Sequence, residues 1–218
     1  MSLYEDLFEA LNRARVRYIV VGGIAVVLHG HARLTADVDL VIDLDPAEAL
    51  RAIDALTDLG LLPRTPVDPH AFADAEIRDE WIRTKNMQVF SLIDPTNPLR
   101  VVDIFVEYPM PFEQLWARST VMRFGQEPIR VVGIDDLMAM KEAAGRAQDR
   151  ADVDALRKIM KIKPEDTVSE WPVTYEANED AQRLEVARMT PEQRLRWVEN
   201  NLDVGADGAM RRKAQQEG

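Results

Sequence analysis

Residues 18–42 read YIVVGGIAVVLHGHARLTADVDLVI, and the chain is best interpreted outward from this stretch. It starts with a β-branched, apolar run that is typical of a buried strand, and it passes through the pair Gly22-Gly23 into a short apolar segment. It ends in the alternation Asp37-Val38-Asp39-Leu40, which is typical of a second strand. We therefore expect a strand, a glycine turn, a short buried helix and another strand, in this order.

Three aspartates are placed so that they can meet. Asp37 and Asp39 are two residues apart, and side chains at this spacing project from the same face of a strand, roughly 6.6 Å apart. Asp103 interrupts the later apolar run 101–105, where a carboxylate needs a compensating partner. Carboxylates that face one another repel unless cations neutralise them, and oxygen ligands favour Mg²⁺ or Mn²⁺. Because Mg²⁺ usually also binds substrate phosphates, we predict a metal site built around a nucleoside triphosphate.

Strands and helices alternate along most of the remaining chain, which predicts an α/β (α+β) fold with a mixed, twisted β-sheet flanked by helices. We expect one domain over residues 1–165, followed by a helical C-terminal appendage over 166–218 whose end is disordered. The other expected strands lie at 87–93, 100–107 and 128–132. The expected helices lie at 3–15, 47–59, from about 135 and from about 149 to 163, and we expect an irregular segment over 62–80.

Composition narrows the possible functions. The 218 residues include no cysteine, which excludes disulfides, thiolate zinc sites and a cysteine nucleophile. The longest apolar stretch, 18–28, is far shorter than the ~20 residues of a membrane span, and no export signal is visible, so we expect a cytoplasmic protein. The net charge of -11 opposes non-specific nucleic-acid binding, so any RNA contact would be local.

The glycine pair, the Asp-x-Asp pair and the third acid on a later strand together form a pattern. Val21-Gly22-Gly23 followed by Asp37-Val38-Asp39-Leu40 resembles the DNA polymerase beta-like nucleotidyltransferase superfamily. Within that superfamily, the segment 22–42 looks like the minimal bacterial enzymes related to the AbiEii-type toxins of toxin–antitoxin systems. Four further positions contribute to this likeness, namely Lys141, Gly145-Arg146, Asp149 and Asp152. The resemblance covers roughly residues 17–157.

The resemblance implies a nucleotidyltransferase fold and a role for each acid. Asp37, Asp39 and Asp103 would bind the metal, and Asp103 would also help to activate the acceptor hydroxyl. Gly22 and Gly23 would form the turn that faces the nucleotide phosphates.

The resemblance also implies nucleotide-binding roles for basic and polar residues. Lys141 would act at the active site by contacting the phosphates, although a lysine on a helix is more often solvated. Arg33 and Thr35 match an Arg-x-Thr-x-Asp lead-in of this subgroup, with Arg33 either a phosphate clamp or an exposed structural arginine. We interpret Asp149 and Asp152 as structural residues that cap a helix.

Together these implications predict a Mg²⁺-dependent nucleotidyltransferase that moves a nucleoside monophosphate from a triphosphate to a hydroxyl. The acceptor could be a tRNA 3' end, a protein or a small molecule, and one setting would be the toxin of a toxin–antitoxin system with an antitoxin partner. The first alternative is a catalytically weak nucleotidyltransferase-like module that binds or regulates within such a pair. The second is a metal-dependent phosphoesterase that uses the same acids on water.

Overall fold

A seven-stranded mixed sheet forms the centre of the protein in the computed structural model, which describes residues 4–162, 181 and 184–202. The strand order is β3-β4-β5-β2-β1-β7-β6, with parallel pairing of β5 with β2 and of β1 with β7 and antiparallel pairing elsewhere. The strands are β1 (Tyr18–Val20), β2 (Val38–Ile42), β3 (Leu62–Pro63), β4 (Val89–Ile93), β5 (Val101–Phe105), β6 (Thr120–Phe124) and β7 (Glu127–Val131).

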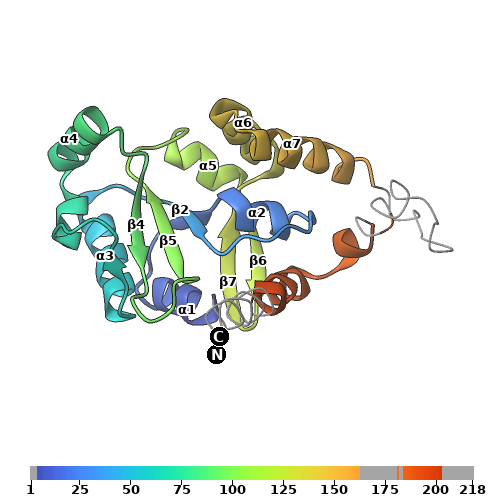
Figure 1. The fold of residues 1–218 in the computed structure, drawn as a ribbon, viewed down its shortest axis with the longest axis horizontal. Coiled ribbons are helices and arrows are strands. Elements are labelled where there is room, and N and C mark those ends of the chain that lie inside the picture. Colours follow the sequence, from blue (N-terminus) through green and yellow to red (C-terminus); the bar gives the residue numbers. More distant parts are fainter. Residues whose placement is uncertain (1–3, 163–180, 182–183, 203–218) are drawn as a thin grey trace, which may run out of the picture.

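Helices flank the sheet, as the sequence predicts. In Figure 1, α1 lies below the strands, α3 lies to the left of β4, and α6 and α7 lie above the strands, while α2 packs against β2 and α6. The helices are α1 (Glu5–Arg13), α2 (Gly22–Leu28), α3 (Pro46–Asp58), α4 (Ala75–Lys85), α5 (Phe112–Arg118), α6 (Ile134–Ala144) and α7 (Ala147–Ile159), with a 3-10 helix η1 (Pro69–Ala73). The fold-class prediction is therefore confirmed.

The central strands are apolar because the sheet is covered on both faces. All three residues of β1 are buried, and so are four of the five residues of β2. In β5, Val102 and Ile104 are buried, and Asp103 projects to the opposite face. The parallel register of β2 and β5 pairs Asp39 with Asp103, which places the two acids side by side on one face.

The expectation of an irregular segment over 62–80 is wrong. This part of the chain contains β3, η1 and the first half of α4. Its acids act at helix ends, since the Asp68 carboxylate accepts from the His70 N–H and the Asp74 carboxylate accepts from the N–H groups of Glu76 and Ile77. Acids that seemed to interrupt regular structure are in fact N-caps. The elements α5 and β6 were also not expected from the sequence.

Within the described part of the C-terminal appendage, 181 and 184–202, residues 184–188 and 191–202 are helical. Leu195 and Val198 are fully buried in the same apolar cluster as the sheet residues. The Arg194 guanidinium donates to the carbonyl of Leu28 at the end of α2. The expected disordered end lies outside the described residues. Within the described part of the chain, no helix combines the length and the apolar character that crossing a membrane requires.

Candidate active site

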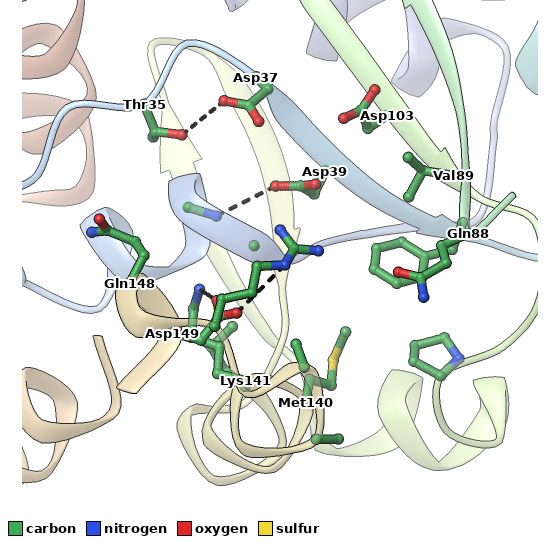
Figure 2. A pocket seen from close by; sticks show the side chains of 18 of the residues that line it. Thr35, Asp37, Asp39, Gln88, Val89, Asp103, Met140, Lys141, Gln148 and Asp149 are labelled. Atoms are coloured by element: carbon green, nitrogen blue, oxygen red, sulfur yellow. Dashed lines mark hydrogen bonds and ion pairs between the residues drawn. The ribbon is translucent and has the colours of Figure 1, made fainter. Parts of the chain in front are cut away.

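The three predicted aspartates converge on one face of the central sheet, on and directly before the interior strands β2 and β5. Carboxylate oxygens of Asp37, Asp39 and Asp103 all lie within 4.8 Å of one another, and Figure 2 shows them around one space. Asp37 immediately precedes β2 and is exposed, whereas Asp39 and Asp103 are partly buried on the adjacent strands β2 and β5. The strand spacing that was inferred from the sequence thus brings the acids together.

Electrostatics at this cluster are unfavourable without a cation. Burial, together with the charges of Asp37 and Asp103, raises the pKa of Asp39 from 3.8 to about 7. Burial and the charge of Asp37 also raise the pKa of Asp103, although a hydrogen bond from Ser91 opposes this. One buried oxygen of Asp103, Oδ1, has no hydrogen-bond partner among the described residues. An oxygen-only donor set of this kind fits a hard divalent cation.

The glycine pair leaves space for the side chains of this site. Gly22 has a φ of +61°, and a Cβ at this position would lie 1.8 Å from Oδ2 of Asp39. A Cβ on Gly23 would lie 2.5 Å from Oγ1 of Thr35. The Gly23 N–H points to Oδ2 of Asp39 over 3.4 Å. Both glycines are therefore required for the close approach of the polar side chains to the start of α2.

The loop before β2 is held by side-chain hydrogen bonds. The Thr35 hydroxyl donates to Oδ1 of Asp37 over 3.1 Å, and the Tyr4 hydroxyl donates to the Thr35 carbonyl over 3.1 Å. Thr35 and Tyr4 are both buried. This chain of contacts orients Asp37, which lies outside the strand and lacks its backbone pairing.

Lys141 and Arg33 are joined through buried carboxylates. Lys141 Nζ lies 2.8 Å from Oδ2 of Asp152 and 3.2 Å from Oδ1 of Asp149, and Arg33 Nη1 lies 2.6 Å from the same Oδ2 of Asp152. The Lys141 side chain is only 8% exposed and that of Asp152 is fully buried. Lys141 is thus not a solvated surface lysine, and Arg33 is not an exposed one.

The expectation that Asp149 and Asp152 cap a helix is wrong. The αL conformation of Gly145 ends α6, and Arg146 is the N-cap of α7. Both acids lie inside α7, where their carboxylates face Lys141. Sequence reasoning missed this role because the partners are distant along the chain and a capping explanation was available locally.

A cavity of about 510 Å³ joins these groups. It includes all predicted site residues, and it also includes an apolar part that sequence reasoning missed. The sequence of β5 could have indicated this apolar part, because Phe105 is two residues from Asp103 and must share its strand face. The apolar lining consists mainly of Val89, Phe105, Pro109, Met110, Leu137 and Met140.

Comparison with known proteins identifies a protein family that matches the chain. The family described as "Nucleotidyltransferase of unknown function (DUF6036)" matches residues 1–166. No curated protein gives a significant sequence match.

Two solved structures are similar to the chain. The lincomycin-bound lincosamide antibiotic adenylyltransferase LnuA is 16% identical, with a TM-score of 0.47, over 69% of this chain and 92% of that one. The antibiotic-resistance factor ANT(2'')-Ia is 10% identical, with a TM-score of 0.42, over 98% of this chain and 96% of that one.

Proposed function

Because the chain belongs to the nucleotidyltransferase family DUF6036, we propose that it is a metal-dependent enzyme that transfers a nucleoside monophosphate from a triphosphate to a hydroxyl group. The observation that carries this proposal is the pairing of Asp39 with Asp103 in register, with Asp37 within 4.8 Å. A carboxylate cluster with raised pKa values and an unpartnered buried oxygen destabilises the fold when it is empty, and a bound cation would relieve this repulsion.

Asp37, Asp39 and Asp103 would hold Mg²⁺ or Mn²⁺. Bound there, a divalent cation would neutralise the carboxylates, orient the triphosphate and stabilise negative charge on the transferred phosphoryl group. Gly22 and Gly23 line the same cavity as Lys141 and Arg33, and their lack of a Cβ lets Asp39 and Thr35 approach the start of α2, where the phosphates would bind.

Asp103 is proposed to act on the acceptor. Its carboxylate would take the proton of the acceptor hydroxyl. The acceptor oxygen then forms a bond to the α-phosphorus, the bond from this phosphorus to the bridging oxygen breaks, and pyrophosphate leaves. Lys141 and Arg33 supply positive charge toward the departing phosphates.

The likeness to AbiEii-type toxins favours a toxin with an antitoxin partner, and the candidate acceptors are a tRNA 3' end, a protein and a small molecule. The residues of the site would be the same in each setting, and label transfer distinguishes the three acceptors.

Label transfer tests the proposal. The purified protein is incubated with each α-labelled nucleoside triphosphate, Mg²⁺ or Mn²⁺, and either total RNA, cell protein or a small-molecule extract. We expect metal-dependent labelling that Asp39→Asn lowers by at least about a thousandfold. Asp58→Asn, which changes an exposed acid at the end of α3, is the control and should retain the activity.

Two outcomes would contradict the proposal. Labelling that proceeds equally in a chelator, or equally with Asp39→Asn, would show that the carboxylate cluster does not hold a catalytic metal. Release of free nucleoside monophosphate without any labelled acceptor would instead assign the same acids to a phosphoesterase.

A further inference from the structure

The basic side chains of the cavity all gather at one end. Arg33 contacts Asp152, Lys141 contacts both Asp149 and Asp152, and Arg146 Nε lies 3.8 Å from Oδ2 of Asp149. These three are the basic residues that line the cavity within the described chain, and each contacts an acid of α7. Among the residues that line the cavity, positive charge therefore lies beside α7, while Arg64, outside the lining, acts on Asp103 only through its charge.

The other end of the cavity adjoins Asp103 and is apolar. Phe105 shares the strand face of Asp103, and Val89 is its partner on β4. Figure 2 shows Val89 and Gln88 on the side of Asp103, away from Lys141 and Asp149. Two apolar side chains here, those of Val89 and Phe105, line the cavity and are only half-buried, and so are Met110 and Met140 elsewhere in the lining, with Met140 next to Lys141 on α6. Apolar surface that is left facing a cavity is typical of a ligand site.

We propose that this apolar end is the acceptor subsite, and that the acceptor is a small hydroxyl compound with an apolar body and no phosphate groups. This inference rests on the proposed function, since the acceptor hydroxyl must reach Asp103 while the triphosphate lies at the basic end. The body of the acceptor then lies against Phe105 and Val89. Gln88 lines the same end and can form a hydrogen bond with a polar group of the acceptor.

Charge argues against a nucleic-acid acceptor at this end. RNA binding takes its free energy from basic side chains that replace counterions at the phosphates, and no basic residue of the described chain lines the apolar end. The chain also has a net charge of -11. A cavity of about 510 Å³ is of the size that encloses small molecules.

The alternative occupant of the apolar subsite is the base of the nucleotide. Steady-state kinetics distinguishes the acceptor from the base. If the acceptor lies here, truncation of Phe105 or Met140 raises the KM of the acceptor and leaves the KM of the triphosphate unchanged. If the base lies here, the same truncations raise the KM of the triphosphate. Both side chains face the cavity and are only half-buried, so their truncation should preserve the fold.

The test uses the full chain, Mn²⁺, an α-labelled triphosphate and alcohols of two kinds at equal concentration. The apolar alcohols are phenethyl alcohol, cyclohexylmethanol and tryptophol, and the polar ones are glycerol and ethylene glycol. We expect at least about tenfold more label on an apolar alcohol than on glycerol, and an acceptor KM raised about tenfold by Phe105→Ala and by Met140→Ala. Ligand-observed NMR should show binding of the same alcohol that both variants weaken.

Met138→Ala is the matched control, because Met138 is on the same helix as Met140, is half-buried and does not line the cavity. It should leave both KM values unchanged. Preferential labelling of total RNA, label on the apolar alcohols no greater than on glycerol, or a raised KM for the triphosphate in Phe105→Ala would overturn the inference. Each of these results leaves the proposed function intact, whereas loss of all metal-dependent use of the triphosphate would overturn the proposed function itself.

Discussion

The cavity contains an acidic group, formed by the strand-borne Asp39 and Asp103 with Asp37, and a basic group, formed by Arg33 and Lys141. The backbone positions the strand-borne acids, whereas side-chain contacts position the basic group. Asp39 and Asp103 are carried by adjacent strands whose backbone register sets their separation. Arg33 and Lys141 come from a loop and a helix, and they meet only because Asp152 contacts both. No ion pair to a described residue neutralises the acidic group, whereas the basic group is already paired.

This difference predicts which group tolerates substitution. Backbone hydrogen bonds of β2 and β5 persist when a side chain changes, so the strand-borne acids can be altered without loss of the fold. The basic pair depends on one fully buried carboxylate, and its removal leaves two cations without their shared partner. The acidic group is thus available to an external cation, whereas buried carboxylates hold the basic group in place beside the proposed phosphate site.

The largest expected effect comes from Asp152→Ala. Removing one partner from a buried ion pair leaves uncompensated charge, so the free energy of unfolding should fall by about 3–5 kcal/mol. Urea denaturation at neutral pH measures this change. Asp154→Ala on the same helix is the matched control, since the Asp154 side chain is 72% exposed and its loss should cost under about 0.5 kcal/mol. Equal losses for the two variants would show that Asp152 does not hold the basic group together.

Gly22→Ala should have the next largest effect, because it disturbs the strand-borne group from outside. The new Cβ would lie 1.8 Å from Oδ2 of Asp39, and the alanine would have to adopt a φ of +61°. We therefore expect the free energy of unfolding to fall by about 2–3 kcal/mol and Mn²⁺ to bind more weakly. Gly60→Ala separates the two causes. Gly60 also has a positive φ, of +84°, but nothing lies within 4 Å of its Cβ position, so its loss should be about 1 kcal/mol with Mn²⁺ binding unchanged.

Thermal unfolding and Mn²⁺ calorimetry on both glycine variants provide the measurement. Identical Mn²⁺ affinity for Gly22→Ala and the wild type would contradict a steric role for Gly22 beside Asp39.

The sequence predicted the strand-borne group well because its geometry is local. Asp39 lies within β2 and Asp37 directly before it, so the i, i+2 spacing of an extended segment was enough to place the two acids near each other from the sequence alone. The prediction that Asp103 joins them needed only one further strand with the correct face, and the register of β2 and β5 provides it.

The basic group could not be predicted in the same way. Arg33 and Asp152 are 119 residues apart in sequence, and neither the strand period nor the helix period relates them. The acids of α7 had a sufficient local explanation as caps, and the opposite error hid α4, where Asp74 was assigned to an irregular segment although it is a true cap. Capping and periodicity rules pair a polar residue with a partner nearby in the sequence. They fail when the true partner is a charged residue far away in the sequence.

A third prediction concerns the repulsion within the acidic group. A carboxyl whose pKa rises from 3.8 to about 7 on folding binds its proton more tightly in the folded state, so the stability of the metal-free protein falls as pH rises from about 4 to about 7. Asp39→Asn removes this contribution. In a chelating buffer at pH 8 the variant should be more stable than the wild type by on the order of 2 kcal/mol, and near pH 4 the difference should vanish.

Unfolding curves at several pH values, with and without Mg²⁺, measure this effect. Added Mg²⁺ should stabilise the wild type and leave Asp39→Asn nearly unchanged. A wild type that is at least as stable as Asp39→Asn at pH 8 without metal would argue against unrelieved repulsion at the cluster.

The smallest effect should come from Tyr4→Phe, which tests the one acid that lies outside a strand. Asp37 is oriented by Thr35, and the Thr35 carbonyl accepts from the Tyr4 hydroxyl, so loss of this hydroxyl should cost about 1 kcal/mol and weaken Mn²⁺ binding by about threefold. Tyr108→Phe is the matched control. It removes a hydroxyl that bonds to the Leu44 N–H and to Asp43, outside the cavity, so stability should fall while Mn²⁺ affinity stays constant. If both tyrosine variants bind Mn²⁺ as the wild type does, Asp37 keeps its orientation without the loop contacts. The orientation of Asp37 would then not depend on the hydroxyl of Tyr4.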